Sequence, residues 1–500
     1  MSLLSGHEFS PANCLLLVPP DSELGSFLQE TRRLVLFRPD ILLFIEEDLD
    51  QNAIGKKESR LEDRQWYHNI QGSLAGLEKC KPTTERKPFL QQGRPRMSPI
   101  AAYFFWMLCV YSKKGVKSLE VRDLLLESKT VELFLREEGI SVPGLSTIHE
   151  NTNAISLKTR NLILDAQIAM AKRDKLENFQ KCQVDSTMVD ANTAWPTDSG
   201  LMWKLLNRLD KRCKKLKKSA QLSVSLPEMG HTLRFLKRLD FQISNTPGSK
   251  PDLRKELYQD FFDRVEVAAT EIYLKLSDLK DSLAQTQVRP SKKKRLESLF
   301  EAICSDMTDL DNIITHSTLR VLTGKHKPVE QRVLSVSDPD AAYLKKGRRE
   351  ARIGYKPQLC RSEKGLVTGV IIPKGNVGDA PLLQELCTQS FERTKVIPEA
   401  FSGDGGYASW ENRQWLKDKS VKYPSFSSSR GKRITPRDEW ESPEYQSLRN
   451  WRSAVESMMS HIKGIVGFGK LLRRGIEGVR AELMGKVIAF NFIKMSNLRI

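Results

Sequence analysis

Three acidic residues stand where strands and a helix could direct their carboxylates to one point. Asp185 lies in a β-type run from Gln183 to Val189, Asp404 ends a later short strand, and Glu456 lies on a helix further along. Phosphodiester cleavage by two metal ions needs carboxylates that hold the ions roughly 3.5 to 4 Å apart. Hard oxygen ligands suit Mg2+ or Mn2+ rather than zinc. The sequence therefore predicts a phosphoryl-transfer site in which Asp185, Asp404 and Glu456 bind two Mg2+ ions, for which Mn2+ can substitute.

The helix that carries Glu456 supports this prediction because it places two cations beside the carboxylate. Arg452, Glu456 and Lys463 follow one another at i, i+4 and i+11, which puts them within about 40° of one another at 100° per residue. One helix face would then present a metal-binding carboxylate between two phosphate-binding cations. Arg452 and Lys463 are therefore predicted to contact phosphates.

Several of these sequence features also have simpler, non-catalytic explanations. A single aspartate at a strand end is more often a cap or turn residue than a metal ligand, so the prediction depends on the three acids together. Asp198 begins a helix, where it or Thr197 would accept backbone N–H bonds. Gly405-Gly406 is not followed by GKS or GKT, so it is no phosphate-binding loop and is expected to allow a tight turn. Eight scattered cysteines without a CxxC pair argue against a zinc site and a disulfide framework.

The elements that must position these residues are strands flanked by helices. Ala351 to Cys360 and Leu366 to Ile372 are rich in β-branched or aromatic residues and are predicted to form a hairpin. Shorter strands are expected before Asp404 and from Val421 to Phe426. Helices are expected from Tyr445 to Ile462 and from Glu477 to Met495. This order predicts an α/β protein of mixed α+β type, with helices packed on a mixed sheet.

The remaining chain is mostly helical by its apolar spacing. Residues 98–178 contain several short helices, which either bind DNA or only pack; residues 199–323 contain two long helices that suggest a hairpin or an antiparallel bundle. The predicted division is an N-terminal region and linker, a helical DNA-binding domain, the first part of a catalytic core, a helical insertion, and the rest of the core with C-terminal helices. Their bounds are 1–97, 98–178, 179–198, 199–323 and 324–500.

The charge of the chain indicates a polyanionic partner. Lys and Arg exceed Asp and Glu by 80 to 62, giving a net charge of +18, and nucleic acid is the default ligand for such a surplus. A basic helix face and a cluster beside the predicted hairpin are candidate phosphate contacts, although a solvated face or a disordered loop would look the same. The candidate DNA-binding residues here are Lys204, Arg208, Lys211 and Lys215 on the helix, and Lys346, Arg348 and Arg349 in the cluster.

Several short motifs resemble one protein family. Val184 to Val189 with Trp195 to Asp198, Lys346-Gly347 leading to Gly354-Tyr355-Lys356, Gly375-Asn376 with Asp379, and Gly403 to Ala408 are similar to catalytic-domain motifs of bacterial insertion-sequence DDE transposases, closest to the ISNCY-type group. The resemblance covers roughly residues 98 to 495. Related families carry a tyrosine three residues before the arginine at 452, and this chain has Arg449 there.

The resemblance implies a ribonuclease-H-like core of about five strands. Asp185 would lie on the first, Asp404 after the fourth, and Glu456 on the helix beyond the fifth. It further implies a transposase that cleaves double-stranded DNA at the terminal inverted repeats of a mobile element and joins the 3′ hydroxyl to target DNA. Because two DNA ends must meet, a homodimer or larger assembly is expected. The helical block after the first strand is unusual among these families, so its function is less readily inferred from the resemblance.

Two rival functions remain open: a nuclease with the same core that never joins ends, and a domesticated or regulatory DNA-binding protein without turnover. The longest apolar run, Pro99 to Tyr111, has about half of the ~20 residues that a membrane helix needs. No signal peptide is visible. A cytoplasmic, nucleoid-associated protein of a prokaryote is therefore expected, with no membrane partner.

Overall fold

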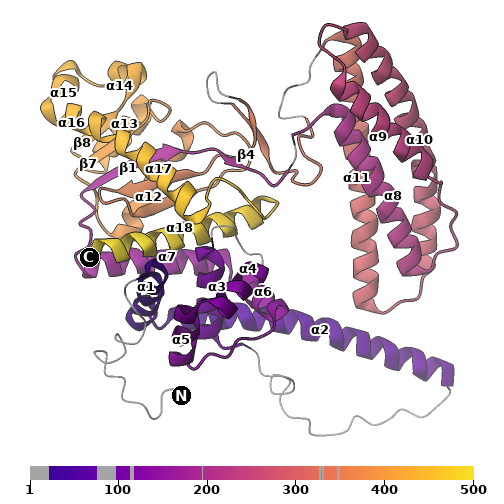
Figure 1. Cartoon of the computed structure of the whole chain (residues 1–500), viewed down its shortest axis with the longest axis horizontal. Coiled ribbons are helices and arrows are strands. Elements are labelled where there is room, and N and C mark those ends of the chain that lie inside the picture. The colour runs from indigo at the N-terminus through magenta and orange to yellow at the C-terminus, as the bar shows by residue number, and fades with distance from the viewer. Residues whose placement is uncertain are drawn as a thin grey trace. The chain divides into compact units, whose positions relative to one another are not determined.

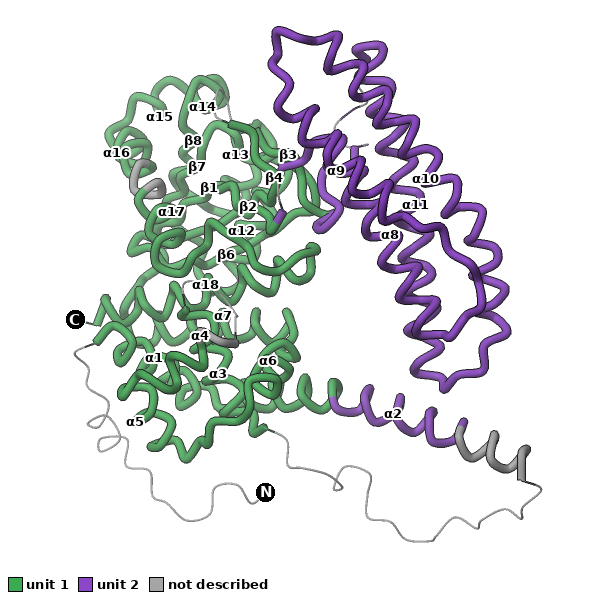
Figure 2. Tube along the Cα trace, turned by 45° about the vertical axis from the view of Figure 1, so that its right-hand side comes forward, with its two compact units in different colours: residues 1–52, 94–192, 340–500 green, residues 53–93, 193–339 purple. Residues whose placement is uncertain are grey.

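The computed structural model describes residues 22–75, 97–112, 118–193, 195–325, 328, 332–345 and 350–499, with the backbone alone at 67–75, 118–120 and 453–456. The chain divides into two compact units (Figure 2). Unit 1 comprises residues 1–52, 94–192 and 340–500, and unit 2 comprises 53–93 and 193–339. None of the described helices is long and apolar enough to cross a membrane.

Unit 1 is built on a five-stranded mixed sheet with the order β6-β5-β1-β7-β8. Central β1 pairs antiparallel with β5 and parallel with β7, which in turn pairs parallel with β8. β5 and β6 are buried along their whole length, as expected of strands covered on both faces. The predicted mixed α+β class with a five-stranded mixed sheet is confirmed. The strands are β1 (Lys181–Ser186), β5 (Gln358–Ser362), β6 (Val367–Ile371), β7 (Ala400–Gly403) and β8 (Tyr423–Phe426).

The two faces of this sheet contact different elements. Cys182 and Val184 on β1 pack in one apolar core with α12 (Leu383–Thr394). On the other face, Gln183 donates from Nε2 to the carbonyl of Arg452 at 2.9 Å, and the Ser402 hydroxyl donates to the carbonyl of Leu448 at 3.2 Å. This second face is therefore covered by α16 (Pro443–Trp451) and the start of α17 (Ser453–Val466).

A second, three-stranded sheet corrects the predicted hairpin. The run from Ala351 to Cys360 is not one strand: it breaks at Lys356-Pro357 into β4 (Arg352–Tyr355) and β5. Proline has no N–H for a ladder and disfavours a central strand. β4 pairs instead with β2 (Val189–Asp190) and β3 (Ala342–Leu344), whereas β5 and β6 form the expected antiparallel pair. A Cβ on Gly354 would lie 1.9 Å from the Val189 carbonyl oxygen, so only glycine allows this close pairing.

Helices from both ends of unit 1 pack together beneath the sheet (Figure 1). α18 (Ile476–Arg499) contacts α7, α3 and α1, and α7 also contacts α12. α3 is buried from Ala101 to Val110, which confirms that the longest apolar run is a core helix. These elements and the remaining helices of unit 1 are α1 (Glu23–Phe37), the first part of α2 (Ile41–Ala75), α3 (Pro99–Tyr111), α4 (Ser118–Glu127), α5 (Lys129–Glu137), α6 (Leu145–Ala154), α7 (Leu157–Arg173), η3 (Ala380–Leu382), α13 (Trp410–Asp418), α14 (Ser428–Ile434) and α15 (Arg437–Glu441).

Unit 2 contains an antiparallel helical bundle, as the apolar spacing predicts. Its helices are α8 (Asp198–Ala220), α9 (Gly230–Asn245), α10 (Pro251–Gln285) and α11 (Pro290–Thr323). They share one core of buried Leu, Ile, Phe and Met side chains. Thr197 caps α8 by accepting the N–H of Gly200 at 3.1 Å, one of the two expected caps, whereas Asp198 pairs with Arg320 at 2.7 Å.

Candidate active site

Asp185 and Asp404 occupy matching positions on two parallel strands. The β1–β7 register ends with Val184 opposite Gly403, so the two aspartates are the next residue on each strand. Adjacent strands lie about 4.8 Å apart, which brings the two backbones side by side. Each carboxylate accepts the backbone N–H of the following residue through Oδ1, from Ser186 and from Gly405, both at 2.7 Å.

Strand alternation also assigns these aspartates to one face of the sheet. Gln183 and Ser402 are registered partners whose side chains bond to carbonyls of the α16–α17 segment. Side chains two residues apart on a strand lie on the same face of the sheet. Asp185 therefore lies on the same face as Gln183, and Asp404 on the same face as Ser402. Asp185 is 7% exposed. Both carboxylates therefore belong to the side of the sheet on which α17 lies.

The predicted helix from Tyr445 to Ile462 is two helices that meet at Arg452. Glu456 lies in the first turns of α17, beyond the fifth strand of the sheet, as the resemblance implies; its side chain is outside the described part. The Arg452 guanidinium lies 3.6 Å from Asp404 Oδ1, and Nζ of Lys463 donates to the Met188 carbonyl at 3.2 Å. These two predicted phosphate contacts thus reach Asp404 and the segment after β1.

A cleft of about 460 Å³ is lined by Asp404 and Lys463. This is within the size range of small-molecule sites. Three further cations line it, namely Lys345, Arg352 and Lys356, together with the hydroxyls of Ser186 and Thr187. Cations beside an acid at the end of a parallel strand pair form a surface suited to a phosphate ester.

Asp379 and Lys356 belong to the motifs that resemble the transposase family, but no role was predicted for them. Both line this cleft. Lys356 Nζ is 2.7 Å from Asp379 Oδ1, which also accepts from Gln358 Nε2 at 2.8 Å. The Tyr407 hydroxyl donates to Gln358 Oε1. This chain of bonds joins β5 to the turn that follows Asp404. Two features of the sequence could have pointed to these residues. Lys356 directly precedes Pro357, and Asp379 lies four residues after Gly375.

The turn after Asp404 needs both of its glycines. The N–H of Tyr407 donates to the Asp404 carbonyl at 3.0 Å, which confirms the expected tight turn. A Cβ on Gly405 would lie 1.9 Å from Ser428 Oγ, and one on Gly406 would lie 2.7 Å from Asp379 Oδ2. Close packing on both sides therefore fixes the backbone that carries Asp404.

Burial keeps the phenol in this network protonated. Burial raises the pKa of Tyr407 well above its ordinary value, and the negative charges of Asp379 and Asp185 raise it further. The neutral phenol can then donate to Gln358. The tyrosine is a fixed donor in the wall of the site rather than a proton carrier near neutral pH.

The carboxylates fit a divalent metal, although the described residues do not complete a site. No group of three or more His, Cys, Asp or Glu among the described side chains is arranged to hold an ion, and that search does not include the Glu456 side chain. Asp185 and Asp404 offer hard oxygens from adjacent strands, which suits Mg2+ or Mn2+. Glu456 on the facing helix would be the third ligand.

Of the other predicted DNA contacts, those among the described residues belong to α8 of unit 2. Lys346, Arg348 and Arg349 are outside the described residues. On α8, Lys211 and Lys215 are exposed and Lys204 is half-buried. Arg208 instead faces α11, where it pairs with the carboxylate of Asp306. Arg449, at the family's tyrosine position, stacks 4.0 Å from the Trp440 ring centroid.

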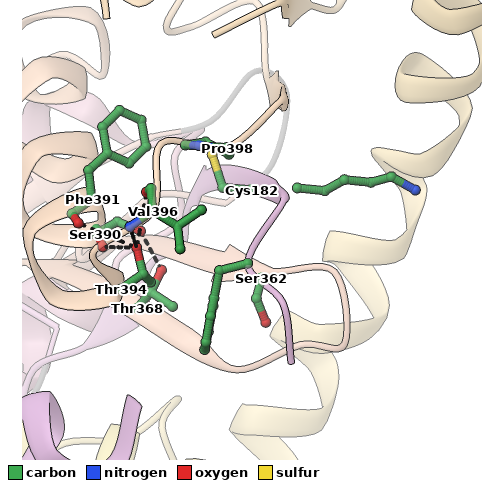
Figure 3. A pocket seen from close by; sticks show the side chains of 10 residues that line it. Cys182, Ser362, Thr368, Ser390, Phe391, Thr394, Val396 and Pro398 are labelled. Atoms are coloured by element: carbon green, nitrogen blue, oxygen red, sulfur yellow. Dashed lines mark hydrogen bonds between the residues drawn. The ribbon is translucent and has the colours of Figure 1, made fainter. Parts of the chain in front are cut away.

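A second cavity, of about 10 Å³, lies between β1, β5 and α12. Figure 3 shows Thr368, Ser390 and Thr394 gathered at it, and the Thr368 and Ser390 hydroxyls are 2.6 Å apart. This volume is about that of one water molecule. The cavity is too small for any part of a nucleotide.

Comparison with protein families finds one match. Residues 317–492 match the family described as "Transposase DDE domain". The match includes Asp404 and Glu456 and begins after Asp185. Comparison with curated proteins and with solved structures finds none. The match supports a DDE transposase domain over this part of the chain.

Proposed function

We propose that the protein is a DNA transposase that binds the ends of an insertion sequence, cleaves them and joins the 3′ hydroxyl ends to target DNA by DDE phosphoryl transfer. The observation that carries this proposal is the matched position of Asp185 and Asp404 on β1 and β7, on the side of the sheet that faces α17. The domain match over residues 317–492 supports it.

Each residue of the site has a distinct role in this proposal. Asp185, Asp404 and Glu456 would hold two Mg2+ ions, which when bound would activate the attacking oxygen and stabilise the leaving oxygen. Arg452, 3.6 Å from Asp404, balances the carboxylate charge. Lys356 and Lys463 line the cleft and would bind phosphates next to the reacting bond.

The finer parts of the proposal concern the biological setting. We infer an origin in a bacterial element of the ISNCY-type group, terminal inverted repeats and target DNA as the ligands, and a homodimer or larger assembly on DNA. A cytoplasmic, nucleoid-associated location follows from that substrate. The five-part division of the chain, with DNA binding at 98–178, belongs to the same proposal.

The test is strand cleavage and joining on DNA that carries the flanking element ends, with Mg2+ or Mn2+. Asp185→Asn, Asp404→Asn and Glu456→Gln should each abolish both steps while DNA binding persists. Asp418→Asn is the matched control: this exposed acid at the end of α13 accepts from Gln414 at 2.8 Å and does not line the cleft. It should keep activity near that of the wild type.

Other outcomes would change the assignment. Activity that survives any one of the three substitutions would show that residue to be misassigned. Cleaved but never joined products would favour a nuclease. An inactive wild type that binds DNA would favour a regulatory DNA-binding protein.

A further inference from the structure

The ends of two helices in unit 2 form a strongly basic surface. Residues 211–218 of α8 contain six Lys or Arg and no acid, and residues 289–295, at the start of α11, contain five and no acid. The Asp198–Arg320 pair and the bond from Arg212 to the Ala302 carbonyl at 2.8 Å show that α8 and α11 run antiparallel. The end of α8 therefore lies beside the start of α11. We call residues 211–218 and 289–295 the basic end.

Some cations of the bundle are neutralised within the protein. Arg208 and Arg212 both pair with Asp306, whose side chain is 3% exposed. In the basic end, Lys214 pairs with Asp210 at 2.8 Å, and Lys294 pairs with Glu62 at 3.0 Å. These pairs serve the bundle and its contact with α2.

Other exposed cations of the basic end, Lys211 among them, have no such partner in the described part of the chain. Lys215, Lys218, Lys293 and Arg295 are exposed, and none takes part in an ion pair within the described part of the chain. They come from both helices, so their charges add at one end of the bundle. An anionic ligand could bind them without breaking an internal ion pair.

The start of α11 is only partly neutralised by α2, where Asp63 accepts from the N–H of Ser291 at 2.9 Å and lies 3.5 Å from the Arg289 guanidinium. The N-terminus of a helix carries a partial positive charge, which favours acids and disfavours cations. α11 has 34 residues and no acid in its first turn, yet Lys292 to Arg295 follow directly. Residue choices that oppose local stability are expected at functional sites. One acid, Asp63, binds at the helix end, and the exposed cations Lys293 and Arg295 beside it favour a further anionic ligand, a polyanion.

We propose that the basic end binds the phosphate backbone of duplex DNA without reading its sequence. This inference rests on the proposed function for its substrate and adds a second DNA-binding surface, distinct from the cleft. Lysines act as point charges toward phosphates, and such contacts position a duplex without carrying sequence information. The predicted stripe on α8 is not one open surface, because Arg208 turns to Asp306.

The test measures how salt weakens binding of the full chain to a labelled duplex of arbitrary sequence, with a chelator present so that no cleavage occurs. The variant combines Lys215→Gln, Lys218→Gln, Lys293→Gln and Arg295→Gln. Each phosphate contact contributes about 0.9 to the slope of log K against log salt concentration. Loss of all four should therefore reduce the slope by about 3 to 4.

A matched control removes the same number of positive charges elsewhere on the bundle. Arg234→Gln, Arg238→Gln, Lys250→Gln and Lys255→Gln alter exposed cations outside the basic end. This control should leave the slope close to that of the wild type. An unchanged slope in the basic-end variant, or an equal decrease in the control, would overturn the inference.

The inference and the proposed function can fail separately. If the slope decreases as expected but the wild type neither cleaves nor joins DNA, the basic end still binds DNA and the transposase assignment fails. If the wild type joins ends but the slope is unchanged, only the role of the basic end fails.

Discussion

Lys356 Nζ lies 2.7 Å from Asp379 Oδ1, inside the cleft that also contains Asp404. The same oxygen accepts from Gln358, which accepts in turn from Tyr407 in the turn after Asp404. Asp379 thus orients a cation of the cleft and supports the backbone of a proposed metal ligand. It is a positioning residue for both.

Asp379→Ala should weaken metal-dependent cleavage more than Asp379→Asn. The alanine loses both bonds, whereas the asparagine keeps an oxygen for Gln358. Outer-shell partners of metal ligands typically contribute about 10- to 100-fold in metal affinity or activity. We expect the alanine variant to need correspondingly more Mn2+ for half-maximal cleavage, measured by titration on end-bearing DNA.

DNA binding separates this role from a loss of folding. Both Asp379 variants should bind DNA like the wild type in a chelator. Asp418→Ala, at an exposed acid that accepts from Gln414 at 2.8 Å, is the control and should not shift the Mn2+ titration. A shift of equal size in the control would exclude a specific role for Asp379.

The positions of the two aspartates could be predicted because each is determined by short local patterns. Asp185 lies within a short β-type run, and Asp404 follows β7 and precedes two glycines. The break between β4 and β5 could also have been predicted, because Pro357 has no N–H to donate to a neighbouring strand. The prediction of one strand across it was wrong because β-type composition continues on both sides.

The direction of Arg208 could not be predicted from the sequence. Its spacing with Lys204, Lys211 and Lys215 describes one helix face, but its partner Asp306 lies on α11, almost a hundred residues away. Only the antiparallel packing of α8 and α11 brings the two together. The division of the predicted helix from Tyr445 to Ile462 into α16 and α17 could not be predicted either. It occurs at Arg452, whose carbonyl accepts from Gln183 of the distant strand β1.

Gly354→Ala should destabilise unit 1. A Cβ at this position would lie 1.9 Å from the Val189 carbonyl oxygen, so β2 and β4 would have to separate. Overpacking of this kind costs about 1 to 3 kcal/mol. Urea denaturation should show the loss, and Gly55→Ala in α2, where the new methyl meets nothing within 4 Å, should be neutral or stabilising. Equal stability of the two variants would refute the close β2–β4 approach.

Asp306→Ala should loosen the bundle of unit 2. The substitution leaves Arg208 and Arg212 without the carboxylate that they share, and breaking a buried ion pair costs about 3 to 5 kcal/mol. Both arginines are 29% exposed, so we expect the lower end of that range. Hydrogen exchange of α8 and α11 should accelerate, whereas Asp278→Ala, at an exposed pair with Lys275, should change it little. Unchanged exchange after Asp306→Ala would contradict the role of this pair.

Asp340→Asn should reduce the stability of unit 1 near neutral pH but not in strong acid. The hydrogen bond from Lys374 holds the pKa of Asp340 below its ordinary value of 3.8, and the N–H of Ile476 at the start of α18 also donates to it, at 2.9 Å. Because the folded-state pKa is lower than the unfolded-state pKa, the carboxylate stabilises the fold above about pH 3.8, and this contribution is lost as the pH falls through the folded-state value. We expect the variant to lose about 1 kcal/mol at pH 7. Unfolding temperatures of wild type and variant should therefore differ at pH 7 and converge as the pH falls through the folded-state pKa. A difference that persists unchanged in strong acid would show that the ionised carboxylate is not the source of the stability.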